Sequence, residues 1–297
     1  MKLFETVKKL FWVSRPISWP NTSYPFLVGF LLASVWPLSS LDIATLVVGT
    51  LYFIGPYNLL MYGVNDVFDY ESDIRNPRKG GIEGMKESRQ FHPTILKAVL
   101  VTNVPFLVYL FAVGSWPARI VLAFVVFAAL AYSLKGLRFK EIPFFDSVTS
   151  SFHFVSPLVF ALALVGFQPD AWPWILAFFA WGMASHAFGA VQDIIPDREG
   201  KLHSIATFLG ARKTVWLTLA LYIYASIVVA LQGVQYWAVA LAGFAYVINC
   251  TPYLLITDAT SAKSNKGWKR FLWLNYASGA IVTVTILVLS TNLLFFR

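Results

Sequence analysis

The 297-residue chain contains little charge and a single cysteine. Asp, Glu, Lys and Arg make up 13% of it, about half of the roughly 25% that a soluble domain carries. Because Cys250 stands alone, no intramolecular disulfide can form, and a disulfide-stapled domain is excluded. Hydrophobic residues make up 58% and aromatic residues 17% of the chain. This composition excludes a disordered chain, a coiled coil and an ordinary soluble enzyme, and it indicates a polytopic membrane protein.

Nine long apolar stretches account for this composition, and each suits a membrane-spanning helix of about 20 residues. They cover roughly residues 17–38, 41–64, 95–114, 116–133, 147–166, 171–192, 213–232, 234–256 and 269–294. The stretches are continuously apolar and lack the alternation of transmembrane β-barrel strands. The sequence therefore predicts an all-α polytopic membrane protein with nine transmembrane helices, in a single domain over residues 1–297.

The Lys and Arg residues are distributed unevenly over the connections between these stretches. All 23 except Arg119 and Arg297 fall on one side of the membrane that nine helices define. Positively charged loops stay in the cytoplasm, so we expect a cell-membrane protein with a cytoplasmic N-terminus, an external C-terminus and a cytoplasmic cap of loops. This topology accounts for the net charge of +8, and no nucleic-acid partner is expected.

Seven of the 15 acidic residues lie in two short segments, 65–73 and 192–200, which follow the second and the sixth apolar stretch. In each segment the aspartates have the spacing of one helical face, provided that the helix continues through them. They are Asp66, Asp69 and Asp73 in the first segment, and Asp193 and Asp197 in the second. Both rows of carboxylates are expected at cytoplasmic helix ends, which places the candidate active site toward the cytoplasm.

Carboxylates that share one face repel each other unless a cation lies between them. Oxygen ligands of this kind select Mg²⁺ or Ca²⁺, and Mg²⁺ is commonly held by one or two carboxylates together with substrate phosphates. We therefore expect the five aspartates to be catalytic and to bind two or three Mg²⁺ ions that bridge a diphosphate. Asn65 offers an amide to the metal or the phosphate. The basic residues that are candidates for contacting the diphosphate or the metal ligands are Arg15, Arg75, Arg78, Lys135, Arg138, Lys140 and Arg198.

At these positions the sequence resembles the UbiA-type intramembrane prenyltransferases. The segment from Asn65 to Asp73 matches the family's Asn-Asp-x-x-Asp-x-x-x-Asp motif, and the segment from Asp193 to Asp197 matches its Asp-x-x-x-Asp motif. Some relatives carry a further aspartate where this chain has Gly189. Two more segments resemble the family's basic third segment and its N-terminal signature; they are 132–140 and 14–16. The resemblance implies nine helices around a central cavity that is open to the bilayer, with the diphosphate held near the cytoplasmic cap.

Within the family, segments 65–81 and 137–157 resemble bacterial lycopene elongases, which add dimethylallyl units to the ends of lycopene in C50 carotenoid biosynthesis. The resemblance implies a Mg²⁺-dependent reaction that transfers a prenyl group from an allylic diphosphate to lycopene. The allylic diphosphate expected as donor is dimethylallyl diphosphate. Membrane lipids and enzymes of the same pathway are then further partners. Two alternatives stay open: prenylation of an aromatic acid in quinone biosynthesis, and a cation-coupled membrane transporter, which also carries intramembrane acids.

The reaction expected with lycopene also requires a group that accepts a proton. If the terminal double bond of lycopene attacks an allylic cation, the resulting tertiary cation must lose a proton, and the sequence offers no evident base besides the diphosphate itself. His186 lies seven residues before Asp193 on the same helical face, and either lines the cavity or makes an interhelical hydrogen bond. Aromatic residues near the motifs either stabilise a cation or simply pack; they are Phe68, Tyr70, Tyr132, Phe152 and Phe154.

Overall fold

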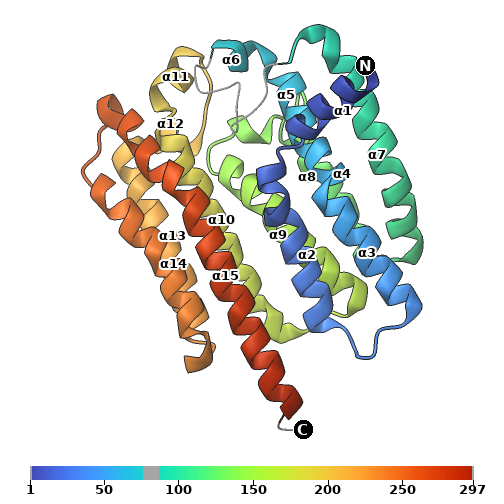
Figure 1. Ribbon diagram of the computed structural model, residues 1–297. Coiled ribbons are helices and arrows are strands. Elements are labelled where there is room, and N and C mark those ends of the chain that lie inside the picture. The colour runs from blue at the N-terminus through green and yellow to red at the C-terminus, as the bar shows by residue number, and fades with distance from the viewer. Residues whose placement is uncertain (1, 76–86, 296–297) are drawn as a thin grey trace. The chain divides into compact units, whose positions relative to one another are not determined.

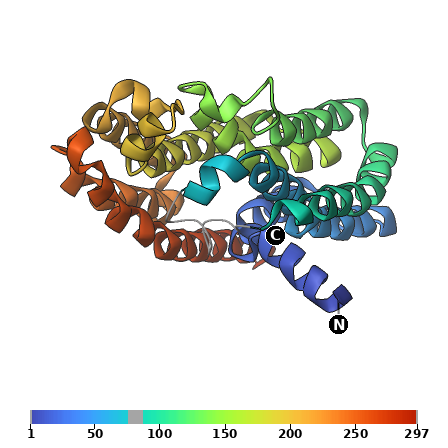
Figure 2. The ribbon, with the colours of Figure 1, turned by 90° about the horizontal axis from the view of Figure 1, so that it is seen from above.

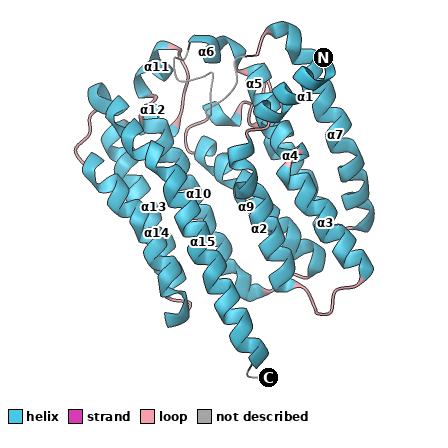
Figure 3. Ribbon diagram, viewed as in Figure 1, coloured by secondary structure: helices cyan, strands magenta, loops and turns pink. Residues whose placement is uncertain are grey.

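The computed structural model describes residues 2–75 and 87–295, and these residues form helices and loops without any strand (Figure 3). The chain divides into two compact units. The first unit comprises Met1–Phe139 and Phe152–Pro169, and the second comprises Lys140–Ser151 and Asp170–Arg297. The all-helical class predicted from the sequence is therefore confirmed for the described residues.

The first unit contains four long helices and the greater part of a fifth (Figure 1). The four long helices are α2 (Trp19–Ala33), α3 (Ser40–Ile54), α7 (His92–Val113) and α8 (Trp116–Ala131). The fifth is α9 (Phe145–Val165), whose first turns belong to the second unit. Helix α1 (Lys2–Val13) precedes them, and three short helices follow α3: α4 (Pro56–Asn58), α5 (Val64–Phe68) and α6 (Tyr70–Arg75).

The path from α3 to α6 is interrupted at positions that the sequence explains. Pro56 lacks an N–H and cannot continue the hydrogen bonding of α3, so backbone carbonyls are freed. The carbonyl of Phe53 accepts from the Thr22 hydroxyl (2.7 Å) and the Asn58 amide (2.7 Å), which restores the lost bonding inside an apolar surrounding. A π-helical stretch, Leu59–Gly63, then leads into α5. Such stretches are frequent at functional sites.

Aromatic rings form the centre of the first unit's core. Phe26, Phe53 and Phe160 are fully buried, with ring centroids 5.2–6.2 Å apart. The Phe26 ring lies directly on the backbone of α3, because a Cβ atom at Gly49 would stand 2.1 Å from it. This packing joins α2, α3 and α9 and fixes the helix whose continuation carries the first aspartate motif.

The second unit contains four long helices: α10 (Trp172–Val191), α13 (Ala211–Ala230), α14 (Trp237–Cys250) and α15 (Asn265–Phe295). Two short helices, α11 (Ile194–Glu199) and α12 (Ile205–Leu209), connect α10 to α13. Figures 1 and 2 show α13, α14 and α15 as successive neighbours, and α13 also packs along α10. Their common core contains the buried rings of Phe188, Tyr222, Tyr246 and Phe271.

Seven of the described helical segments are long and apolar enough to cross a membrane. They are Ser40–Phe68, Arg89–Val113, Phe145–Val165, Pro169–Val191, Ala211–Ala230, Val234–Tyr253 and Asp258–Ser290, each corresponding to one apolar stretch of the sequence. The two remaining stretches form the shorter helices α2, with 15 residues, and α8, with 16. A helix of 16 residues spans only about 24 Å, so the predicted count of nine is not confirmed by length.

Candidate active site

The first aspartate motif lies where helix α5 ends. Asn65 and Asp66 belong to α5, and Asp69 follows its last residue with φ −98° and ψ 2°. This conformation lies in the sparsely populated bridge region between helix and strand. The chain then begins α6 at Tyr70. The expectation of one helix continuing through the motif is therefore wrong, because Asp69 turns the backbone. Asp73 lies in α6, and its side chain is outside the described residues.

Asp66 forms a buried ion pair with Arg15. The guanidinium Nη2 lies 2.8 Å from the carboxylate Oδ1, and the two side chains are 15% and 3% exposed. Arg15 itself has a φ of 50°, in the left-handed region that side chains rarely adopt, and its guanidinium lies 4.2 Å from the centroid of the Tyr62 ring. A conformation of this kind costs about 1–3 kcal/mol and persists where surrounding contacts determine it. The ion pair and the ring contact provide those contacts.

Asp69 is held by a second set of polar groups. The Asn65 side-chain amide donates to Asp69 Oδ2 (2.6 Å) and lies 3.0 Å from the Ser133 hydroxyl oxygen, to which it also donates. Arg138 Nη2 lies 3.5 Å from Asp69 Oδ1, and Arg138 also has a positive φ, of 41°. The structure thus brings Arg138 and Ser133, from the segment after α8, to the first motif.

The other predicted basic residues of this region differ in their surroundings. Lys135 is exposed and Lys140 is partly buried, in the first and the second unit respectively. The Arg75 side chain and the whole of Arg78 lie outside the described residues. Arg15 and Arg138 are therefore the two predicted cations that the described part of the chain places against the aspartates of the first motif.

The second motif lies where helix α10 ends. Asp193 precedes α11 with φ −97° and ψ 0°, and its carbonyl accepts from the backbone N–H of Asp197 at 2.8 Å. The two aspartates are thus one helical turn apart, as the sequence predicted. Pro196 lies in the first turn of α11, where its missing N–H breaks no helical bond. Both aspartates are partly buried.

Arg198, which follows the second motif, is held by other parts of the same unit. Its Nη1 lies 2.7 Å from Asp258 Oδ2, and its Nη2 donates to the carbonyl of Thr207 at 3.1 Å. The other oxygen of Asp258 accepts from the backbone N–H of Ala211, at the start of α13 (2.7 Å). Arg198 therefore ties α11 to the ends of α12 and α13.

Gly189, at the position where some relatives carry an aspartate, is in close contact with Trp268 of α15. A Cβ atom at Gly189 would lie 2.9 Å from the indole ring. An aspartate does not fit there unless the indole moves, so the departure from the motif accompanies a different packing. Next to it, Gln192 accepts a hydrogen bond from the side-chain amide of Asn265 and donates to the carbonyl of Gly189.

The donor set of the two motifs fits a hard cation that is also bound by its substrate. Among the described residues, no group of three His, Cys, Asp or Glu side chains gathers as a complete metal cage. Mg²⁺ does not require one, because it is usually bound through one or two carboxylates and keeps its remaining positions for water and phosphate oxygens. The first motif supplies the buried carboxylates of Asp66 and Asp69 and the amide of Asn65 around the end of α5, which fits that requirement.

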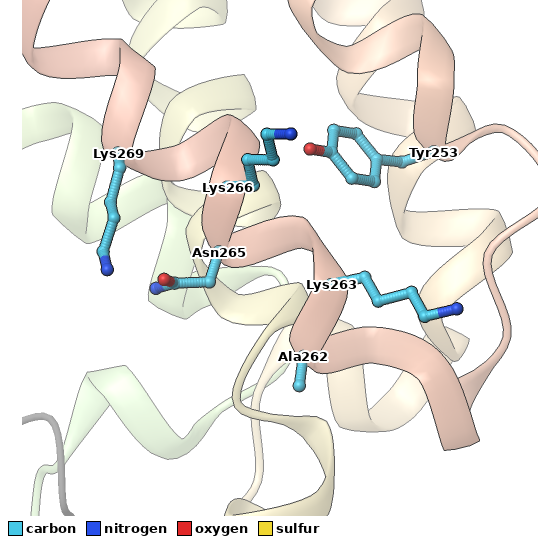
Figure 4. A pocket seen from close by; sticks show the side chains of 6 residues that line it. All are labelled: Tyr253, Ala262, Lys263, Asn265, Lys266 and Lys269. Atoms are coloured by element: carbon cyan, nitrogen blue, oxygen red, sulfur yellow. The ribbon is translucent and has the colours of Figure 1, made fainter.

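The second unit also contains an open basic pocket of about 580 Å³. It is lined by Tyr253, Ala262, Lys263, Asn265, Lys266 and Lys269. Figure 4 shows Lys266 extending toward the Tyr253 ring, with Asn265 and Lys269 on the opposite side of the helix. The sequence assigned these lysines to membrane topology only, and the structure places Lys263, Lys266 and Lys269 in the lining of one open pocket.

An apolar cavity of about 350 Å³ lies in the first unit, between α5, α7 and α8. Phe68, directly before Asp69, is among its lining residues. Tyr132 makes an edge contact with the His153 ring at 5.1 Å, and Tyr70 makes one with His92 at 4.9 Å. Phe68 thus lines a cavity, whereas Tyr70 and Tyr132 each make an edge contact with a histidine ring.

Sequence analysis assigned no role to one acidic residue, which lies within segment 137–157. Asp146, at the start of α9, has no exposed surface and lies 3.6 Å from the imidazole Nε2 of His186. A single aspartate at a helix start is the common pattern of a solvated helix end, so the sequence contained no signal for its burial. The contact appears only when α9 and α10 pack together.

Known proteins resemble this chain in sequence and in fold. The model of the UbiA prenyltransferase family matches residues 22–275. A lycopene elongase/hydratase of Corynebacterium glutamicum is 44% identical over 290 residues, covering 97% of this chain and 99% of that protein. The C50 β-cyclic carotenoid biosynthesis protein LbtBC of a Dietzia species is 50% identical over 94% of this chain, which spans 64% of that relative's length.

The fold agrees with that assignment. A UbiA homologue from Archaeoglobus fulgidus, solved with DMAPP and Mg²⁺, superposes with a TM-score of 0.65 at 18% identity, covering 91% of this chain and 98% of that one. The resemblance that the aspartate motifs indicated is therefore confirmed. The chain belongs to the UbiA prenyltransferase family and is a multi-pass membrane enzyme of prenyl transfer.

Proposed function

We propose that this enzyme transfers a dimethylallyl group from dimethylallyl diphosphate to the ends of lycopene, in the biosynthesis of C50 carotenoids. The observation that carries the acceptor is the end-to-end match to a protein named lycopene elongase/hydratase, at 44% identity. The Dietzia relative, named for C50 carotenoid biosynthesis, supports it over the part that this chain spans. The A. fulgidus homologue with bound DMAPP supports the choice of donor.

The diphosphate is held, in this proposal, by two or three Mg²⁺ ions on Asp66, Asp69, Asp73, Asp193 and Asp197, with Asn65 beside them. Bound Mg²⁺ would neutralise the charge that develops on the departing diphosphate. Arg15 and Arg138 already lie against the first motif, and a guanidinium can bind phosphate oxygens through two parallel hydrogen bonds. Arg75, Arg78, Lys135 and Lys140 supply further positive charge around it, whereas Arg198 keeps α11 in place through Asp258.

The chain's own groups set the geometry of the reaction. The hydrogen bonds of Asn65 orient Asp69, and the ion pair of Arg15 orients Asp66 before substrate arrives. Preorganised charges of this kind stabilise a transition state because they need no rearrangement during the reaction. Burial of both carboxylates also excludes water, which would otherwise capture an allylic cation.

We further propose that α2 and α8 complete nine transmembrane helices and that both units form one catalytic domain. The cations favour a cytoplasmic N-terminus, an external C-terminus and an active site under a cytoplasmic cap of loops. The lysine pocket at the start of α15 then faces anionic lipid headgroups, which attract basic residues near the membrane surface.

The direct test is product analysis. Purified enzyme in lipid vesicles is given Mg²⁺, labelled dimethylallyl diphosphate and lycopene, and carotenoids are resolved by mass. The proposal predicts label in C45 and C50 carotenoids, formed one dimethylallyl unit at a time. A parallel reaction replaces lycopene by an aromatic acid. Label in the aromatic product, with none in carotenoid, would overturn lycopene as acceptor and establish the quinone-type reaction instead.

A further inference from the structure

Asp146, which is fully buried, lies against the partly buried His186 inside the second unit. The Asp146 carboxylate is fully buried and accepts the backbone N–H groups of Ile205 and Ser147, each at 2.7 Å. Its Oδ2 atom also lies 3.6 Å from Nε2 of His186, on α10. This separation is longer than a hydrogen bond, as contacts between catalytic groups often are before substrate binds.

The Asp146 carboxylate favours one tautomer of the His186 imidazole. An anionic oxygen beside Nε2 favours the tautomer with a proton on that nitrogen, which leaves the lone pair on Nδ1. The carboxylate thereby orients the ring, in the same manner as a carboxylate behind a catalytic histidine. The His186 side chain is 21% exposed, so the ring is not sealed in the core.

The position of His186 along α10 relates it to the reacting carbons. It lies seven residues before Asp193, about one and a half turns before α10 ends at Val191. Mg²⁺ held by Asp193 and Asp197 would bind the diphosphate at this end of α10. A dimethylallyl group extending from that diphosphate along α10 would run toward the imidazole, where the new carbon–carbon bond would form.

We propose that His186, oriented by Asp146, accepts the proton that ends the reaction. This inference rests on the proposed transfer to lycopene. The terminal π bond of lycopene forms a bond to C1 of the dimethylallyl cation and leaves a tertiary cation. Nδ1 of His186 removes a proton from a carbon next to that centre, and the C–H electron pair becomes the new double bond. Diphosphate leaves with the electrons of the broken C–O bond, and the proton later passes from the imidazolium to solvent.

The same pair then controls a choice between two products. A tertiary cation that is not deprotonated is captured by water and gives an alcohol, the outcome of hydration. His186 thereby favours the elongated alkene over the hydroxylated carotenoid. Asp146 is a positioning residue in this scheme, because it acts through the imidazole.

The test compares His186→Ala and His186→Gln with Ser185→Ala as matched control. Ser185 is the neighbouring residue on α10, and its hydroxyl lies 2.9 Å from that of Tyr222 in the core. Each variant is given Mg²⁺, labelled dimethylallyl diphosphate and lycopene, and three quantities are measured: diphosphate released, elongated alkene and hydroxylated carotenoid. Loss of a general base costs about 100-fold or more, so both His186 variants should lower alkene per diphosphate released at least tenfold and raise the hydroxylated share.

Asp146→Asn is measured in the same assay. It should shift the product ratio in the same direction by a smaller factor, and combining it with His186→Ala should add nothing further. A ratio unchanged from wild type in His186→Gln, at normal thermal stability, would overturn the proposal. If wild-type enzyme makes no elongated carotenoid at all, the proposed function has failed, which is a different result from an intact ratio in the variants.

Discussion

Asp69 and Asp193 share one backbone conformation, with φ/ψ of −98°/2° and −97°/0°. Each stands between a helix of the apolar bundle and a short helix of six residues that continues its motif, α6 (Tyr70–Arg75) or α11 (Ile194–Glu199). Both motifs thus carry an aspartate at a bend in the bridge region of backbone space, where many active-site residues are found. The equivalence supports a paired role for these two residues in binding the metal and the diphosphate.

The buried pair of Arg15 and Asp66 gives the first prediction. Arg15→Ala leaves a nearly inaccessible carboxylate without its cation, so the free energy of unfolding should fall by about 3 kcal/mol, and KM for dimethylallyl diphosphate should rise at least tenfold. Arg15→Lys keeps the charge but loses the planar guanidinium, so its stability and its KM should lie between those of wild type and Arg15→Ala. Thermal unfolding in detergent and steady-state kinetics measure these effects.

The matched control is Lys8→Ala, which removes an exposed cation from helix α1. It should leave both quantities near wild type. An Arg15→Ala enzyme with normal stability and normal KM would show that the ion pair is dispensable for the first motif.

The contact between Arg198 and Asp258 gives the second prediction. The two side chains are 47% and 39% exposed, so water screens the pair and its coupling energy should be only about 0.5–1 kcal/mol. Arg198→Ala and Asp258→Ala should both reduce thermal stability and should be less than additive in a double-mutant cycle. Neither should change KM for the diphosphate by more than about twofold. If Arg198→Ala raises KM strongly and Asp258→Ala does not, Arg198 contacts the substrate directly.

The close packing of Gly189 against Trp268 gives the third prediction. Gly189→Ala places a methyl group 2.9 Å from the indole, and overpacking of this kind costs about 1–3 kcal/mol. Gly279→Ala is the control, since a Cβ atom there meets nothing within 4 Å and the change should be neutral or stabilise by up to about 1 kcal/mol. Equal melting temperatures of the two variants would contradict the packing.

The sequence predicts much of this molecule because the decisive patterns are local. Apolar stretches of helical length and the spacing of Asp193 and Asp197 are visible in the chain itself, and seven long helices and the turn of α11 follow them. What it does not predict depends on contacts between distant segments. Nothing local predicts that the helix ends at Asp69, because the spacing of Asp66, Asp69 and Asp73 suits a continuing helix. The burial of Asp146 depends likewise on residues 40 and 59 positions further along, His186 and Ile205.

Arg198 illustrates the same limit. Next to an aspartate motif, an arginine is an evident candidate for binding phosphate, and its partner Asp258 lies 60 residues away. Gly189 is similar, since the sequence shows a missing carboxylate and the structure shows the indole in contact with it. Long-range packing therefore decides which residues contact substrate and which support the ones that do.

The central claim is that both aspartate motifs serve one Mg²⁺-dependent reaction. Its most direct test measures the rate of diphosphate release from labelled dimethylallyl diphosphate in the presence of lycopene, with and without Mg²⁺. Asp69→Asn and Asp193→Asn should each lower the Mg²⁺-dependent rate at least 100-fold, about 2.7 kcal/mol of transition-state stabilisation, while both variants insert and melt normally. Asp170→Asn, at an exposed aspartate outside the motifs, should keep the wild-type rate. Normal turnover by either motif variant would contradict the account.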